Sequence, residues 1–183
     1  KTPVLGGRMR TSGRLYAFDV SDKRLPTPKP RMARSGLSNI HPVVIASEND
    51  PRVKRLAGKI DRVLVDAPCS GLGTLRRNPD LKWRQSPEAL AELTAKQTAI
   101  LGSAARLVKV GGRLVYATCS LLPEENEAIV AAFLAANPAF VQLNAQDVLA
   151  KQDIVVACGE QLHLTPAAHD TDGFFAAVME RQG

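Results

Sequence analysis

The sequence has 183 residues, the length of a single domain, and 45% of them are hydrophobic, which is enough for one packed core. The formal net charge is +6, and residues 1–35 hold nine Lys or Arg against two Asp. This basic excess favours a polyanion such as nucleic acid, although an ordinary basic surface has the same composition. No apolar run is long enough to cross a membrane and no signal-peptide pattern opens the chain, so we expect no membrane partner.

The three cysteines stand at positions 69, 119 and 158 and form no CxxC pair, and the three histidines have no metal-like spacing. We therefore expect no metal site. An odd number of cysteines without a targeting segment fits a reducing compartment better than a disulfide framework. The sequence thus predicts free thiols in a cytoplasmic protein.

The strands are predicted by short apolar runs. In chain order these are Leu15–Val20, Pro42–Ala46, Arg62–Val65, Arg113–Ala117 and Phe174–Met179. Helical spacing predicts one helix within Ser86–Val108, with Ser86 as its N-cap, and a second helix over Pro123–Ala136. Strands that alternate with helices predict an α/β fold with a mostly parallel sheet.

Residues 21–35, where a helix should follow the first run, contain Pro26, Pro28 and Pro30. Proline removes a backbone donor and costs about 3 kcal/mol inside a helix. We therefore predict an irregular or extended segment up to Pro30, with helix only after it.

Polar or reactive residues stand where three of the predicted strands end, at Asp19, at Asp66–Cys69 and at Thr118–Ser120. Ligands of parallel α/β sheets bind beyond the carboxyl ends of the strands. We therefore expect two carboxylates and two cysteines along one edge of one sheet.

Two motifs carry a family resemblance, DAPCSG at Asp66–Gly71 and ATCS at Ala117–Ser120, the second followed by PEENE at Pro123–Glu127. Together they resemble the RNA (cytosine-5) methyltransferase family, and the similarity runs along nearly the whole chain. The resemblance implies a Rossmann-like class I S-adenosylmethionine-dependent methyltransferase sheet, mostly parallel, with Phe174–Met179 as the one antiparallel strand. It also implies methylation of a cytosine in RNA, with rRNA favoured over tRNA.

The chemistry of that reaction needs thiols. A thiolate that adds to carbon 6 of cytosine makes carbon 5 nucleophilic toward a methyl donor, and the thiolate is later expelled. The resemblance implies that Cys119 is the nucleophile and that Cys69 assists resolution of the adduct. It also implies that Asp66 faces the cytosine and lies beside the cofactor.

The resemblance further implies a set of residues that bind S-adenosylmethionine. Asp19 would accept hydrogen bonds from the ribose, as acidic residues at this place in Rossmann-like sites do. An acidic group after the next strand would lie near the adenine, and Glu48 is favoured over Asn49 and Asp50. Lys1 matches the end of the family's Gly-rich cofactor loop.

Residues 1–183 are therefore predicted to form a single methyltransferase catalytic domain that lacks its N-terminal part. The Gly-rich loop and the first strand of the family's sheet are not found in this sequence. Because that strand is central in the family, we expect an open slot or exposed edges in the sheet.

Several other residues have two interpretations. Arg76 and Arg77 have side chains suited to RNA phosphates. Trp83 is interpreted as a core or loop anchor in preference to a base-stacking residue. The acidic residues Glu124, Glu125 and Glu127 are explained by a favourable helix start.

Two other functions compete with RNA methylation. A DNA cytosine-5 methyltransferase would use the cysteine of the Pro-Cys motif as its nucleophile, and the TCS motif argues against it. A non-catalytic RNA-binding or ribosome-assembly module would retain the fold without the chemistry, and the paired cysteines argue against it. The sequence indicates neither the modified cytosine nor the oligomeric state.

Overall fold

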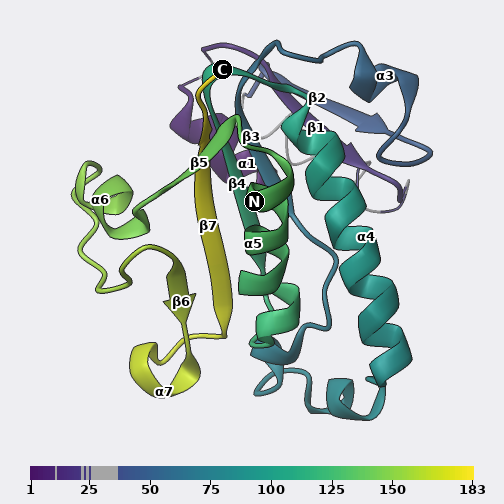
Figure 1. Cartoon of the computed structure of the whole chain (residues 1–183), viewed down its shortest axis with the longest axis vertical. Helices are drawn as coiled ribbons and strands as arrows, with labels where there is room; N and C mark the ends of the chain where they lie inside the picture. The colour runs from purple at the N-terminus through teal and green to yellow at the C-terminus, as the bar shows by residue number, and fades with distance from the viewer. Residues whose placement is uncertain (11, 22, 24, 26–36) are drawn as a thin grey trace. The chain divides into compact units, whose positions relative to one another are not determined.

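The computed structural model describes residues 1–10, 12–21, 23, 25 and 37–183. It divides into two compact units, Lys1–Arg55 and Leu56–Gly183 (Figure 1). The predicted irregular segment with its three prolines, and the helix expected after Pro30, fall outside the described residues.

The first unit contains two strands, β1 (Leu15–Asp19) and β2 (Ile40–Val44), and two short helices, α1 (Thr2–Arg8) and α3 (Pro51–Lys54). The strands pair in parallel over their full length, with Leu15 opposite Ile40 and Asp19 opposite Val44. Both lie close to the ranges that the sequence predicts. The second begins and ends two residues earlier than expected, because its register with β1 starts at the buried Ile40.

The second unit is built on a five-stranded sheet of order β3-β4-β7-β5, with β6 also paired to β7. Its strands are β3 (Ile60–Asp66), β4 (Val108–Thr118), β5 (Phe140–Leu143), β6 (Leu162–Leu164) and β7 (Phe174–Arg181). β3 and β4 are parallel, whereas β7 is antiparallel to each of its three neighbours. The predicted single antiparallel strand is therefore confirmed.

Two helices, α4 (Pro87–Ala105) and α5 (Glu127–Ala136), lie side by side on one face of this sheet (Figure 1). Ser86 is the predicted N-cap of α4, and its hydroxyl accepts a hydrogen bond from the Ala89 amide at 3.2 Å. The remaining elements are α6 (Ala145–Ala150), α7 (Pro166–His169) and three 3-10 turns, η1 (Leu72–Thr74), η2 (Pro79–Trp83) and η3 (Pro123–Glu125). Within the described part of the chain, no helix is long and apolar enough to span a bilayer.

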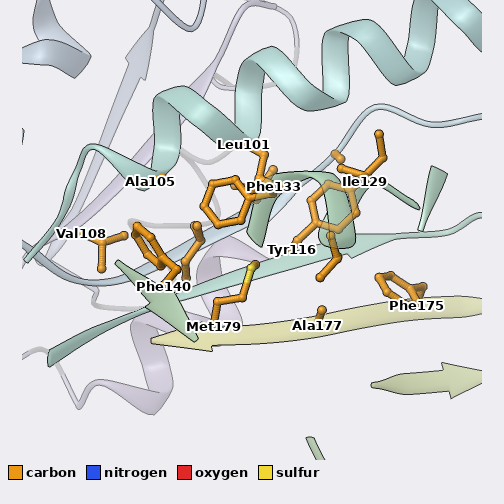
Figure 2. Close-up of a cluster of buried hydrophobic side chains, with 14 residues drawn as sticks. Leu101, Ala105, Val108, Tyr116, Ile129, Phe133, Phe140, Phe175, Ala177 and Met179 are labelled. Atoms are coloured by element: carbon orange, nitrogen blue, oxygen red, sulfur yellow. The ribbon is translucent and has the colours of Figure 1, made fainter. Parts of the chain in front are cut away.

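The hydrophobic core of the second unit lies between these two helices and the sheet. Figure 2 shows Leu101 of α4 and Phe133 of α5 above Tyr116 of β4 and Met179 of β7. Leu101, Tyr116 and Met179 are fully buried. Each such side chain contributes roughly 1.5–3 kcal/mol of burial free energy, so this unit has the material for a stable core of its own.

The single helix predicted over Pro123–Ala136 is wrong. The chain forms the short turn η3 first, and α5 begins only at Glu127. The break falls at Asn126, whose φ of −114° and ψ of −95° are not helical. Side-chain hydrogen bonds hold Asn126 to the end of β4, and they replace the helical bonds that the sequence pattern predicts.

The expectation of one sheet is also wrong, because β1 and β2 form a separate two-stranded sheet. Asp19 therefore stands at the end of a different sheet from Asp66. β3 ends the five-stranded order, and among the described strands it pairs only with β4.

Candidate active site

The two motif cysteines lie against each other. Asp66 at the end of β3 stands opposite Ala117 near the end of β4, so the loops that follow the two parallel strands leave the sheet side by side. The Sγ atom of Cys69 lies 3.4 Å from the Sγ atom of Cys119, and both residues are half-buried. Two residues fifty positions apart in sequence thus form one thiol pair.

The environment favours the protonated form of one thiol. The hydrogen bond to Cys119, followed by burial, raises the pKa of the Cys69 thiol well above its ordinary value. Cys69 therefore stays a thiol near neutral pH and can donate its S–H hydrogen toward the sulfur of Cys119.

A buried carboxylate joins the two cysteine loops. Glu125 has no exposed surface, and its Oε1 accepts hydrogen bonds from the Ser70 amide at 2.8 Å and the Gln97 side chain at 3.0 Å. Its Oε2 accepts from the Ser70 hydroxyl at 2.5 Å, and that hydroxyl lies 3.1 Å from the Ser120 hydroxyl. The residues that follow the two cysteines are therefore bonded to each other, and Ser70 links them to the carboxylate.

Asn126 fixes the second loop from the other side. Its Oδ1 accepts a hydrogen bond from the Thr118 hydroxyl at 2.6 Å, and its Nδ2 donates to the Ser120 carbonyl at 3.1 Å. Thr118 and Ser120 flank Cys119, so the backbone on each side of that cysteine is held by one side chain. This arrangement orients Cys119 without contacting its sulfur.

A pair of glycines brings a third loop to the site. The Gly73 amide donates to the Cys119 carbonyl at 2.9 Å, and the Gly73 carbonyl accepts from the Gly173 amide at 2.7 Å. A Cβ atom on Gly73 would lie 2.4 Å from the Gly173 oxygen and 2.7 Å from the Cys119 oxygen. Only glycine fits here, and the contact ties Cys119 to the chain just before β7.

The predicted cofactor residues are divided between the units. Asp66 shares the second unit with the cysteines and is exposed at the end of β3. In the first unit, Asp19 is the last residue of β1, and Glu48 follows the carboxyl end of the parallel strand β2. Lys1, at the N-cap of α1, is also in the first unit.

The structure separates Glu48 from its two competitors. Asp50 is buried at the N-terminus of α3, where it accepts from the amides of Ala46 and Arg52 and pairs with the Arg52 side chain at 2.8 Å. Hydrogen bonds from Arg52 lower the pKa of the Asp50 carboxyl far below its ordinary value. Asn49 is exposed and donates to the Glu48 carboxylate at 2.7 Å. Asp50 is thus committed to local structure, whereas Glu48 and Asn49 are not part of that ion pair.

The arginines after the PCS motif share one acidic partner, and the tryptophan that follows them is exposed. Arg76 and Arg77 both pair with the carboxylate of Asp172, at 2.8 and 3.2 Å. Trp83 is 81% exposed, so its interpretation as a core or loop anchor is wrong. Its indole packs under the Lys82 ammonium, which lies 4.7 Å from the ring centroid.

A surface depression and the third cysteine lie outside this site. An open depression of about 590 Å³, lined by Gly58, Ala105, Phe140 and Arg181 among others, lies at the opposite end of the sheet from Cys119. Cys158 is outside the cysteine pair, in the segment between α6 and β6. Among the residues that the structure describes, no three side chains of His, Cys, Asp or Glu gather into a metal site.

The sequence does not reveal the roles of three residues of the site, Glu125, Gln97 and Asn126. Glu125 is there interpreted as a helix start, and Gln97 and Asn126 are assigned no role. A signal existed for one of them, since Gln97 is a polar residue at a position of the α4 pattern otherwise filled by apolar side chains. Nothing local distinguishes Glu125 from the exposed Glu124 beside it.

The chain resembles proteins of known structure over nearly its full length. A crystal structure of PH0851 is 35% identical and superposes with a TM-score of 0.87, covering 97% of this chain and 39% of that one. A methyltransferase homologue protein from Pyrococcus horikoshii is 30% identical with a TM-score of 0.75, covering 97% of this chain and 56% of that one. The second unit's mostly parallel sheet with one antiparallel strand is the arrangement of class I methyltransferases.

Sequence comparison gives the family. The probable ribosomal RNA small subunit methyltransferase B of Synechocystis sp. is 38% identical over 181 residues, which are 99% of this chain and 40% of the relative. The chain thus spans about two fifths of that relative's length. The profile of the family described as 16S rRNA methyltransferase RsmB/F matches residues 1–180. The chain therefore belongs to the RsmB/F family of 16S rRNA methyltransferases.

Proposed function

We propose that this protein transfers a methyl group from S-adenosylmethionine to carbon 5 of a cytosine in ribosomal RNA. The observation that carries the proposal is the 3.4 Å approach of the Cys69 and Cys119 sulfurs at the ends of two parallel strands. One thiolate and one neighbouring thiol are what covalent activation of a cytosine requires. The names of the family and of its relatives support rRNA as the substrate.

In this proposal Cys119 is the nucleophile. Its thiolate adds to carbon 6 of the cytosine, and the electrons displaced from the ring make carbon 5 nucleophilic. S-adenosylmethionine supplies the electrophilic methyl group that carbon 5 takes. Carbon 5 then gives up its proton to water, the electrons of that C–H bond re-form the ring double bond, and the Cys119 sulfur leaves carbon 6 as a thiolate. The raised pKa of Cys69 supports its role as a thiol that donates a hydrogen bond to the departing sulfur.

The acidic residues at the strand ends fit their proposed partners. Asp66, exposed beside the cysteine loops, would hydrogen-bond the amino edge of the cytosine. Asp19 and Glu48 are carboxylates after neighbouring parallel strands, and such groups accept hydrogen bonds from ribose hydroxyls and nucleoside edges. Lys1 would contact the methionine part. The target base has to leave its stack before carbons 5 and 6 can reach Cys119.

The test is a covalent trapping experiment on the full-length protein. It is incubated with S-adenosylmethionine and small-subunit rRNA transcripts that contain 5-fluorocytosine, and the mixture is run on a denaturing gel. Fluorine at carbon 5 blocks the final proton loss, so a working enzyme stays attached to its RNA. We expect a shifted band with the native protein and none with Cys119→Ala.

Two cysteine variants complete the trapping experiment. Cys69→Ala should still form the adduct, because resolution and not attack needs that thiol. Cys158→Ala is the matched control and should behave as the native protein, since it lies outside the pair. An adduct that survives Cys119→Ala and is lost in Cys69→Ala would reverse the two roles. No adduct with any RNA would favour a non-catalytic RNA-binding module.

A further inference from the structure

Trp83 has an unusual position for its residue type. Tryptophan is highly buried on average in folded proteins, yet this indole is 81% exposed. It ends the 3-10 turn η2, fourteen residues after Cys69 in sequence. Neighbouring side chains at 82 and 84 are charged and also exposed, so the ring does not belong to an apolar patch.

The turn that carries Trp83 is attached to the loop of Cys69. The Gln85 side chain donates a hydrogen bond to the Ser70 carbonyl at 3.0 Å. Leu81 is half-buried against Gly71, where an added Cβ atom would lie 3.2 Å from the leucine methyl group. The inner face of this short segment therefore packs on the cysteine loop, while Trp83 remains exposed to solvent.

The basic side chains near the ring differ in whether they are paired with a carboxylate. Arg76 and Arg77 are paired with Asp172, and Arg84 is paired with Asp80 at 2.5 Å. Lys82 has no carboxylate partner among the residues that the structure describes, and its ammonium lies over the indole. An exposed ring beside an available cation matches a nucleotide, whose base stacks and whose phosphate is negative.

We propose that Trp83 and Lys82 form a stacking platform for an unpaired RNA base that flanks the target cytosine. The indole stacks on the base, and the ammonium of Lys82 contacts the adjacent phosphate. Attachment to the Ser70–Gly71 backbone keeps this nucleotide in register with Cys69 and Cys119. The proposal rests on the RNA substrate of the proposed function and adds a binding position to it.

Trp83 is the only tryptophan of the 183-residue chain, so its fluorescence reports on this position alone. We would titrate the chain with a single-stranded RNA decamer of mixed sequence and with an abasic ribose-phosphate decamer. Stacking should quench more than half of the emission with the RNA and little of it with the abasic strand. Binding of labelled RNA, followed by anisotropy, with unchanged tryptophan emission would overturn the platform.

Variants separate the two contacts. Trp83→Ala should weaken RNA binding about tenfold, whereas Trp83→Phe should retain most of the affinity. Lys82→Gln should lower the slope of log affinity against log salt by about one. Val155→Ala removes a 97% exposed apolar side chain elsewhere and should change neither quantity. Because Trp83 is exposed, its variants should unfold at the native urea midpoint.

The trapping assay keeps this proposal distinct from the catalytic one. In the full-length protein, Trp83→Ala should raise the RNA concentration for half-maximal adduct about tenfold and leave the adduct at saturating RNA unchanged. Quenching of the tryptophan emission without any adduct would contradict the methylation proposal and support the stacking platform. An adduct whose RNA dependence is unchanged by Trp83→Ala would overturn the platform and leave the methylation proposal standing.

Discussion

Glu125 is a carboxylate enclosed by protein where three hydrogen-bond donors converge on it. Removing this carboxylate leaves its hydrogen-bond donors without an acceptor, and each unsatisfied buried donor costs about 1–3 kcal/mol. Ser70 would lose acceptors for both its amide and its hydroxyl. The stability of both cysteine loops therefore depends on one side chain.

We expect Glu125→Ala to lower the free energy of unfolding by about 3 kcal/mol, because it leaves these donors without an acceptor. Glu125→Gln should lower it by only about 1 kcal/mol, since the amide oxygen still accepts from Ser70 and Gln97. Urea unfolding followed by circular dichroism measures both values. Glu124→Ala, at the exposed neighbouring position, is the control and should stay within about 0.5 kcal/mol of the native protein. Equal losses at 124 and 125 would contradict this account.

The candidate nucleophile could be predicted from the sequence, but its support could not. Cys69 and Cys119 follow apolar strands inside specific motifs, and each motif can be recognised from a few consecutive residues. Glu125 acquires its role from Ser70, fifty-five positions away. A PEEN segment read locally has the composition of a helix start, so its burial is invisible before the chain is folded.

At the scale of elements, the loops after β3 and β4 are joined to the start of β7 through Gly73 and Gly173. The close approach leaves no room for a methyl group between the two backbones. The two obstructing atoms are the carbonyl oxygens of Gly173 and Cys119, which belong to the backbone and cannot rotate aside as a side chain can. A substituent on Gly73 can enter only if both the Gly173 backbone and the Cys119 loop move.

We expect Gly73→Ala to destabilise the protein by about 1–3 kcal/mol, as overpacking does, and to slow adduct formation by displacing Cys119. Gly102→Ala is the matched control within α4, where an added Cβ meets nothing within 4 Å. It should stabilise the helix by up to about 1 kcal/mol and leave adduct formation unchanged. Urea midpoints and trapping rates test both variants. A Gly73→Ala protein with native stability and rate would show that the loops are not coupled in this way.

The two predicted helices differ in how well the sequence pattern locates them. α4 follows its pattern from the Ser86 cap onward, and the apolar side chains of its C-terminal half pack on the core. The helix expected over Pro123–Ala136 fails at Asn126, where tertiary hydrogen bonds to Thr118 and Ser120 replace helical geometry. The local pattern therefore predicts the first helix, whereas tertiary hydrogen bonds determine where the second begins.

At the scale of the whole molecule, the parallel α/β class could be predicted and the number of sheets could not. Apolar runs locate strands, but they do not say which strands pair. β1 and β2 pair only with each other among the described strands, and β3 stands at an edge of the larger sheet. The core residues that pack around Tyr116 all come from the second unit. Both cysteines and Glu125 belong to the same unit, so the proposed chemistry is built on that core.

We expect the approach of the two sulfurs to make the protein sensitive to oxidation. A disulfide needs a sulfur–sulfur distance of about 2 Å, a short movement from 3.4 Å. With hydrogen peroxide as the oxidant, the Cys119 thiolate becomes a sulfenic acid, and the Cys69 sulfur then displaces its oxygen as water. Two thiols and one peroxide thus give one disulfide and two waters.

We expect peroxide to abolish adduct formation and dithiothreitol to restore it, while the oxidised chain is lighter by two hydrogen atoms in mass spectrometry. In Cys69→Ala the sulfenic acid has no neighbouring thiol, so prolonged peroxide should carry it to the sulfinic acid and the loss should be permanent. Equal recovery of both proteins would contradict a Cys69–Cys119 bond. The thiol that assists the proposed reaction would therefore also protect the nucleophile from irreversible damage.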